Sequence, residues 1–272
     1  METLFSDDYA QKLEALATES AEKYKNAKPF PHICFDDFLP LDAAEAALKV
    51  FPEPKTLTWT EFNEETQRKL AFNEVEKLPA ALRDVLYFLN CRPMLKFLEI
   101  LTGIKAVIPD PYYAGGGLHQ IRRGGNLEVH ADFNFHPKLK LDRRINVLIY
   151  MNKDWKEEYG GHFELWNKEM TAAEQKILPV FNRCAIFSTT STSYHGHPTP
   201  LACPPERTRK SIATYYYSVG RPEEELNDAH STLFQQRPGV RHHVSVRDIL
   251  VAVTPPIVLT TAKRIRNPRV PQ

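Results

Sequence analysis

The feature that most constrains the fold is a six-residue stretch, residues 127–132, in which apolar and polar residues alternate. Leucine, valine and alanine alternate there with Glu128, His130 and Asp132. In a β-strand this pattern places the apolar side chains on one face, and His130 and Asp132 together on the other. An imidazole and a carboxylate two residues apart supply two of the three ligands of a 2-His-1-carboxylate iron site. The stretch therefore predicts a strand, and a metal site if a third ligand lies elsewhere.

The composition indicates a globular protein with no polyanion-binding surface. The chain has 272 residues, 42% hydrophobic and 25% charged, which is ample for a large core. Its 35 Lys and Arg face 34 Asp and Glu, a net charge of +1, so we expect no nucleic-acid partner. The four cysteines are scattered, which argues against a zinc ribbon or a disulfide framework. The start shows no secretory signal and no apolar run is long enough to span a membrane, so we expect a cytoplasmic protein.

Helical patterns dominate the first hundred residues. Apolar stripes predict helices over residues 5–26, from 41 onwards, over 78–89 and from 93 to a stop at Gly103. Asp42 is expected to cap the second of these helices. A strand is expected within residues 30–40, and residues 52–70 read as a polar loop with short strands.

From about Val107 the pattern changes to short β-rich runs separated by glycine and proline. Strands are expected at 112–113, 118–122, 127–132, 144–151, 162–166, 184–188 and 210–218. Short strands at this spacing favour a sandwich or barrel. We expect a mainly β protein with N-terminal helices packed on the larger sheet of a double-stranded β-helix, the jelly-roll or cupin-like core.

We divide the chain into three parts of one globular unit. Residues 1–106 hold the helices and early strands, residues 107–220 the double-stranded β-helix core, and residues 221–272 a C-terminal extension. Ser245 to Asp248 resemble a capping box that opens an apolar helix. The extension is expected to serve packing or dimerisation, which allows a homodimer.

A third metal ligand and an anion-binding side chain follow downstream. Ser193-Tyr194-His195-Gly196-His197 offers two more histidines, and residues 209–217 form a strand with Arg209, Ser211, Ala213 and Tyr215 on one face. A buried guanidinium needs an anionic partner, and arginine binds carboxylates in a bidentate manner. A metal site and a carboxylate site are therefore expected to face one cavity.

Four alternatives compete with this assignment. His197 competes with His195 as the third ligand, and Arg207 with Arg209 as the anion ligand. His162 and Glu164 repeat the ligand-like spacing on a strand and could form a cupin-type set with His130 and His195. The simplest alternative is that His130 and Asp132 form a hydrogen-bonded pair on an exposed strand.

Taken in order, these motifs resemble those of the Fe(II)- and 2-oxoglutarate-dependent dioxygenases, in the prolyl 4-hydroxylase-like branch. The motifs are His130-Ala131-Asp132, Tyr150-Met151-Asn152, Gly160-Gly161-His162-Phe163, His195, and Arg209-Lys210-Ser211. The opening residues 30–39 also resemble the N-terminal strand pair of that family. The resemblance covers residues 29–220.

The resemblance implies a set of roles for these residues. His130, Asp132 and His195 would hold Fe(II), while Arg209, with Tyr150 and Ser211, would bind the distal carboxylate of 2-oxoglutarate. The co-substrates would be 2-oxoglutarate and O2, and the products would be succinate, CO2 and a hydroxylated substrate. A carboxylate at position 132 favours hydroxylation, because halogenating relatives carry a small residue there.

We expect the substrate to be a small metabolite, an amino acid or a peptidyl side chain. Gln120, Arg122 and Asn134 flank the metal strand and are tentative substrate-binding residues. Gln120 stands where prolyl hydroxylases often have an active-site tyrosine, which argues against a prolyl substrate. Two other classes compete with the dioxygenase: a non-catalytic metal-binding β-barrel, and a cupin-type metalloenzyme that does not use 2-oxoglutarate.

Overall fold

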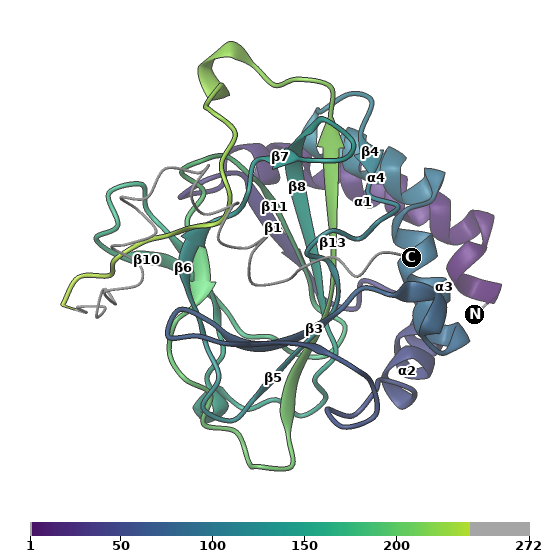
Figure 1. Ribbon diagram of the computed structural model, residues 1–272. Coiled ribbons are helices and arrows are strands. Elements are labelled where there is room, and N and C mark those ends of the chain that lie inside the picture. Colours follow the sequence, from purple (N-terminus) through teal and green to yellow (C-terminus); the bar gives the residue numbers. More distant parts are fainter. Residues whose placement is uncertain (1, 240–272) are drawn as a thin grey trace, which may run out of the picture. The chain divides into compact units, whose positions relative to one another are not determined.

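The computed structural model describes residues 2–239, in which a layer of helices covers one face of a large sheet and a smaller sheet lies on the other side (Figure 1). The α-helices are α1 (Asp7–Lys25), α2 (Leu41–Lys49), α3 (Ala80–Leu89) and α4 (Arg92–Thr102). Four 3-10 helices are described, η1 (Glu2–Phe5), η2 (Val75–Lys77), η3 (Glu157–Tyr159) and η4 (Glu223–Glu225).

The large sheet has nine described strands in the order β1-β11-β8-β13-β5-β3-β2, with β4 beside β13 and β7 beside β8. In chain order these are β1 (His32–Phe35), β2 (Thr60–Asn63), β3 (Arg68–Phe72), β4 (Ile108–Pro109), β5 (Gly117–Arg122), β7 (Phe135–His136), β8 (Leu141–Tyr150), β11 (Cys184–Ser188) and β13 (Thr208–Ser218). These neighbouring strands pair in the antiparallel direction.

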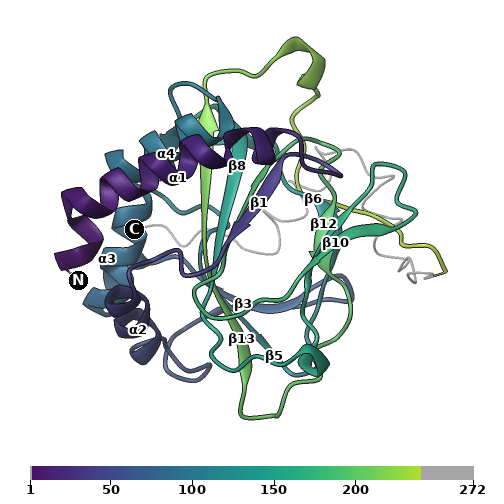
Figure 2. The same cartoon turned by 180° about the vertical axis from the view of Figure 1, so that it is seen from behind.

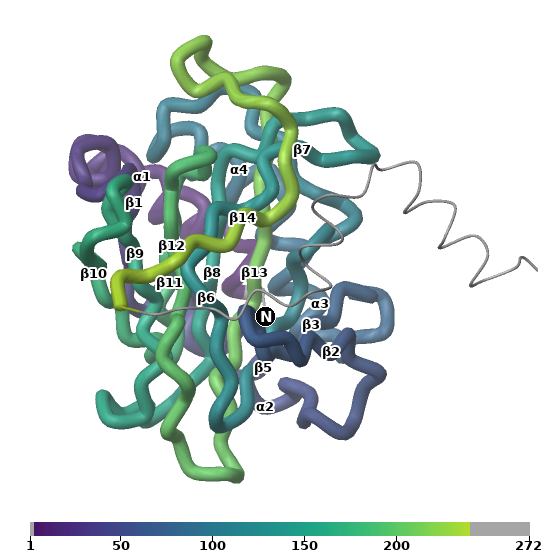
Figure 3. Tube along the Cα trace, turned by 60° about the vertical axis from the view of Figure 1, so that its left-hand side comes forward, coloured from purple at the N-terminus to yellow at the C-terminus, as the bar shows by residue number. Residues whose placement is uncertain are grey.

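The smaller sheet has five described strands in the order β10-β9-β12-β6-β14. They are β6 (Leu127–Ala131), β9 (Phe163–Trp166), β10 (Ala173–Ile177), β12 (His195–His197) and β14 (Leu233–Phe234), and they too pair antiparallel. Seen from behind, β6, β12 and β10 again lie on the side opposite the helices (Figure 2), and Figure 3 shows β10, β9 and β12 side by side. This mainly β arrangement of two sheets with N-terminal helices confirms the predicted fold class.

The alternation of β8 and β13 separates the core from the site. Ile145, Val147 and Ile149 of β8 join Ile212 and Tyr216 of β13 in the main core, which includes the buried residues of all four helices. The intervening residues point to the other face of the sheet, where Asn146 and Leu148 line a cavity. Burial of one face against the helices thus turns the polar face of the sheet inward, toward the smaller sheet.

The expected helices and most of the expected strands are confirmed, with several corrections. Residues 112–113 are not a strand, because Tyr113 has a positive φ of 46° in a turn. Asp42 does not cap its helix: the capping position is Pro40, without a side-chain hydrogen bond, and Asp42 lies in the first turn. The short strands β10, β12 and β14 were not predicted, since pairing partners far away in the sequence define them.

The first part of the C-terminal extension packs on the smaller sheet. Strand β14 pairs with β6, with Leu233 opposite Ala131 and Phe234 opposite His130. Arg237 forms an ion pair with Glu128 of β6 at 3.0 Å. The helix expected after Ser245, and any dimer contact through it, lie outside the described residues. Within residues 2–239, no helix is both long and apolar enough to cross a membrane.

Candidate functional site

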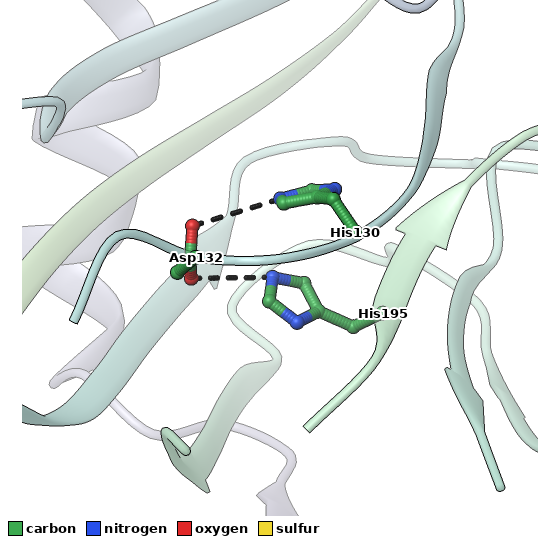
Figure 4. Close-up of side chains that lie close together, drawn as sticks. All are labelled: His130, Asp132 and His195. Carbon is green, nitrogen blue, oxygen red and sulfur yellow. Dashed lines mark ion pairs between the residues drawn. The ribbon is translucent and has the colours of Figure 1, made fainter. Parts of the chain in front are cut away.

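Two neighbouring strands of the smaller sheet bring His130, Asp132 and His195 together (Figure 4). His130 lies on β6, Asp132 follows the end of that strand, and His195 lies directly opposite His130 on β12. The Nε2 atom of His130 lies 3.6 Å from Oδ1 of Asp132, and the Nε2 atom of His195 lies 3.3 Å from Oδ2. One ligand atom from each residue falls within 4.8 Å of the other two, which is the spacing that one metal ion needs.

Backbone carbonyls orient both imidazoles. The Nδ1 atom of His130 lies 2.8 Å from the Glu128 carbonyl, and that of His195 lies 2.9 Å from the Ser193 carbonyl. A carbonyl can only accept, so each Nδ1 carries the proton and donates it. Each Nε2 then presents a lone pair toward Asp132. Three electron-rich atoms that converge without a proton between them need a cation, and this donor set with fixed tautomers suits Fe(II).

Asp132 is held in place from the opposite side. Its Oδ2 accepts hydrogen bonds from Arg143 Nη2 at 2.9 Å and Asn146 Nδ2 at 2.7 Å. Burial acts to raise the pKa of this carboxyl group, yet Arg143 and the adjacent histidines hold the pKa well below its usual value. Burial and the nearby His195 also lower the pKa of His130. Asp132 is therefore ionised and His130 neutral, the protonation states that bind a metal.

The triad opens into a cavity between the two sheets. Its lining combines apolar side chains with basic ones, and Asp132 is the single acidic residue among those that the structure describes there. The lining residues are Lys69, His119, Ile121, Leu127, His130, Asp132, Asn146, Leu148, Phe163, His195, Gly196, His197, Arg209, Ser211 and Tyr215.

Arg209 projects into this cavity from β13 with no acidic partner. The side chain is 5% exposed, and its Nε donates to the Gly161 carbonyl at 2.8 Å. Arg209 forms no ion pair with any of residues 2–239. Gly161 makes this approach possible: a Cβ atom there would lie 3.0 Å from the Arg209 side chain and 2.5 Å from Leu201. A buried guanidinium without a counter-ion is costly, so it marks the place where an anion binds.

Tyr150 and Ser211 lie beside Arg209, in different ways. The Arg209 guanidinium lies 4.9 Å from the centre of the Tyr150 ring, and the Tyr150 hydroxyl is buried close to it. Burial raises the pKa of Tyr150, so this hydroxyl keeps its proton. Ser211 lies opposite Tyr150 in the sheet and lines the cavity. A basic group and two hydroxyl-bearing residues thus gather where the sequence predicted them.

The three tentative substrate residues do not reach this cavity. On β5 the side chains alternate, so His119 and Ile121 line the cavity, while Gln120 and Arg122 point to the other face. Gln120 bonds the Pro52 carbonyl and the Thr208 hydroxyl, and Arg122 faces Glu61 at 3.4 Å. Asn134 bonds the backbone of Asp228 and of His230. The family resemblance had placed Gln120 in the site, but the alternation of β5 turns its side chain to the opposite face of the sheet.

The competing residues lie elsewhere. Arg207 bonds the Lys153 carbonyl and lies near Trp155 and Tyr159, away from the cavity. His162 lies 2.8 Å from Glu157, and Glu164 lies 3.6 Å from Lys176. Neither His162 nor Glu164 belongs to the metal-binding group, so the cupin-type set does not form.

His197 lines the cavity without joining the triad. Both of its ring nitrogens lack a hydrogen-bond partner, and the side chain is 3% exposed. Burial, followed by the charges of Arg209 and Lys69, holds the pKa of His197 well below its usual value. It therefore contributes a neutral imidazole to the wall.

Several residues near the site were not predicted. Lys69 and His119 line the cavity, Arg143 and Asn146 bind Asp132, and the Phe234 ring lies 5.5 Å from the His130 ring. The alternation of apolar and polar residues over 145–150 places Asn146 and Tyr150 on one face of a strand, a signal that could have identified Asn146. Lys69 and Phe234 had no such signal, because the strands that carry them were read as loop and tail.

The fold and the site define a class of protein: a mononuclear metalloenzyme on a double-stranded β-helix, with a cationic anion site in the same cavity. Residues 116–217 match the family model of the 2OG-Fe(II) oxygenase superfamily. The matched segment holds His130, Asp132, His195 and Arg209, and Fe(II) and 2-oxoglutarate are the cofactor and co-substrate of such an oxygenase domain. None of the curated proteins matches the chain.

Solved structures show the same fold. The prolyl hydroxylase of Trichoplax adhaerens, in complex with a peptide fragment of the hypoxia inducible factor oxygen degradation domain, is similar at 16% identity and a TM-score of 0.58, over 80% of this chain and 96% of that one. A prolyl-4-hydroxylase from Pseudomonas putida is similar at 16% identity and a TM-score of 0.54, over 76% and 100%. HygX from Streptomyces hygroscopicus, with nickel, 2-oxoglutarate and hygromycin B bound, is 9% identical with a TM-score of 0.51, over 79% and 96%.

The buried histidines predict an acid sensitivity of the metal-free protein. Burial, followed by the charge of Lys69, lowers the pKa of His119 to about 3, below its value in the unfolded chain. The unfolded state then binds the additional proton between about pH 6.5 and 3, so stability falls as the pH falls through this range, by about 1.4 kcal/mol per pH unit for this group. We expect His119→Gln to reduce the loss of unfolding free energy between pH 6.5 and 5 by about 2 kcal/mol, measured by urea unfolding. An unchanged pH dependence would contradict this assignment.

Proposed function

We propose that the protein is an Fe(II)- and 2-oxoglutarate-dependent hydroxylase that acts on an unactivated C–H bond of a small metabolite, an amino acid or a peptidyl side chain. The observation that carries the proposal is the buried guanidinium of Arg209, which faces the same cavity as the His130, Asp132 and His195 triad and has no acidic partner. A metal alone would not require a second cationic site. A dicarboxylate that binds the metal at one end does require one at the other.

Each residue of the site has a role in this proposal. His130, Asp132 and His195 would hold Fe(II), and three protein ligands would leave room for 2-oxoglutarate and O2. Arg209 binds the distal carboxylate as a fork of donors, and Ser211 adds a hydroxyl at the same wall. The ring of Tyr150 packs against the Arg209 guanidinium and holds it in place. When bound, the iron supplies the redox chemistry that couples decarboxylation of 2-oxoglutarate to oxidation of the substrate.

The reaction balances with these components. One oxygen atom of O2 enters succinate as 2-oxoglutarate loses CO2, and the other replaces C–H by C–OH in the substrate. Asp132 supports hydroxylation over halogenation, because its carboxylate fills the position that a halide would need. The apolar side chains of Leu148 and Phe163 line the cavity and limit the access of water to the reacting groups.

The similar structures do not select the substrate. The Trichoplax adhaerens enzyme was solved with a peptide and HygX with hygromycin B, so one fold holds ligands of very different chemistry. Both small-molecule and peptidyl substrates therefore belong to the proposal for this chain.

The proposal is tested with purified protein, Fe(II), ascorbate and ¹⁸O2. We expect 2-oxoglutarate to be converted to succinate that carries one ¹⁸O atom, and a substrate identified from a mixture of metabolites and peptides to gain one ¹⁸O atom. His130→Ala should abolish both labels. Succinate formation that persists in His130→Ala, or a product that forms without 2-oxoglutarate, would contradict the proposal.

A further inference from the structure

A lysine side chain enters the site cavity from the edge of the large sheet. On β3, Ala71 lies opposite His119 of β5, so the two share a face, and Lys69 lies two residues from Ala71 on that same face. Lys69 and His119 both line the cavity with the triad and Arg209. The ammonium group lies 5.3 Å from the centre of the Phe62 ring of β2. Lys69 thus lines the site cavity, and it comes from β3, which precedes the predicted core segment 107–220.

Lys69 is a partly buried lysine without an acidic partner among residues 2–239. Lysines that do form ion pairs, such as Lys96 with Glu14 at 2.7 Å and Lys153 with Glu45 at 2.6 Å, lie at exposed positions. No carboxylate of the described residues lies within ion-pair distance of Lys69. Burial lowers the pKa of its ammonium group, while Asp132 acts to raise the pKa. A desolvated ammonium above an aromatic ring retains part of its charge stabilisation and can still accept an anion.

The two free cations of the cavity point in different directions. The Arg209 guanidinium turns toward Gly161 and Tyr150, on the β8 side of β13. The Lys69 ammonium turns toward Phe62, at the β2 edge of the sheet. Strand β5 lies between the strands that carry the two residues, and the two groups turn away from each other, so one carboxylate is not expected to bridge both of them.

The charges of the residues that line the cavity leave Lys69 without a counter-charge among the described residues. Asp132 is the single acidic lining residue described, and Arg143 neutralises it at 2.9 Å. One carboxylate of 2-oxoglutarate binds with the metal and the other balances Arg209, under the function proposed above. Lys69 is then the remaining cation without a counter-charge. A single ammonium is best matched by a single negative charge, as on a carboxylate.

We propose that Lys69 binds a carboxylate of the primary substrate, and that the substrate is therefore an acid. The carboxylate belongs either to a small organic acid or to the C-terminus of a peptide. It docks at the β2–β3 edge, and the rest of the molecule extends along Ile121 and Leu127 toward the triad. This inference rests on the proposed role of Arg209 in binding 2-oxoglutarate.

The first measurement separates this role from binding of 2-oxoglutarate. Anaerobic Fe(II) protein is titrated with 2-oxoglutarate and followed through the visible absorption of the chelate. We expect Lys69→Met to keep the wild-type dissociation constant within about threefold, and Arg209→Met to lose the affinity. Loss of affinity in Lys69→Met as large as in Arg209→Met would overturn the inference, because Lys69 would then bind the co-substrate. No chelate in the wild type would instead overturn the proposed function.

The second measurement tests the acid itself. N-acetyl amino acids and their carboxamides, and pentapeptides with free or amidated C-termini, are added as matched pairs to the Fe(II)–2-oxoglutarate complex. We expect one class of acid to change the chelate spectrum and to gain one oxygen under O2, with at least tenfold weaker binding of its amide. Lys69→Met should weaken the acid about tenfold and leave the amide unchanged, and Lys69→Arg should restore part of the affinity.

The outcomes are distinct for each source of the carboxylate. A response confined to the acetylated amino acids assigns a small acid, and one confined to the free-ended peptides assigns a peptide. Equal binding of acid and amide, equal binding to wild type and Lys69→Met, or no response from any acid in the panel would each overturn the inference. Lys168→Met, which changes an exposed lysine far from the cavity lining, is the charge-matched control and should behave as wild type.

Discussion

Arg209→Met should raise the dissociation constant of 2-oxoglutarate by about 100-fold or more, without a comparable loss of metal affinity. The variant leaves one carboxylate of the co-substrate buried without its cation. Truncating one partner of a buried, hydrogen-bonded charge pair costs about 2–5 kcal/mol. Methionine retains much of the volume of the side chain, so the packing on Tyr150 is largely kept. The constant is measured by anaerobic titration of the Fe(II) protein with 2-oxoglutarate.

Arg207→Met is the matched control for this prediction. Arg207 lies two residues earlier on the chain and contacts Trp155 and Tyr159 rather than the cavity. It should bind 2-oxoglutarate as the wild type does. If Arg207→Met lost the affinity and Arg209→Met kept it, the assignment of the anion site to the cavity face of β13 would be wrong.

His195→Ala should lower the affinity for Fe(II) by more than about 100-fold, since even residues that only support a ligand commonly change metal affinity by 10- to 100-fold. His130 on β6 and Asp132 just after it then remain as ligands, and the Nε2 lone pair that β12 supplies is lost. Metal affinity is measured by competition with a chromophoric chelator, with circular dichroism as a check that the variant is folded. Alanine at this position also removes the hydrogen bond from Nδ1 to the Ser193 carbonyl.

Two further histidine variants make this prediction specific. His162→Ala should bind Fe(II) as the wild type does, because His162 contacts Glu157 outside the triad. His197→Gln should also retain the metal, although it lies in the cavity wall. Strong loss of metal in His197→Gln together with retention in His195→Ala would exchange the roles of the two histidines.

Local patterns in the sequence identified the parts of the site that lie on regular strands. The alternation of residues 127–132 placed His130 and Asp132 on one face, and the pattern of residues 209–215 did the same for Arg209 and Ser211. Asn146 shares a face of β8 with Leu148, but the sequence did not identify it as a partner of Asp132. Periodicity assigns a face within a strand, and it does not state which strand lies opposite.

The remaining site residues come from segments whose structure depends on long-range pairing. Lys69 is in β3, which forms by pairing with β2 and β5, and Phe234 is in a two-residue strand defined by β6. Gln120 was misplaced because the resemblance compares positions along the chain and does not show which face of β5 each side chain occupies. The choice between His195 and His197 was decided by the register in which His195 lies opposite His130.

The most direct test of the central claim is the anaerobic visible spectrum of the protein with Fe(II) and 2-oxoglutarate. Wild type should show the weak charge-transfer band of the metal–oxo-acid chelate, and His130→Ala should lack it. The band should need both Fe(II) and 2-oxoglutarate, since each alone lacks the chromophore. Absence of the band, together with tight zinc binding and a melting temperature that 2-oxoglutarate does not change, would show that the triad is a structural metal site and would contradict the account.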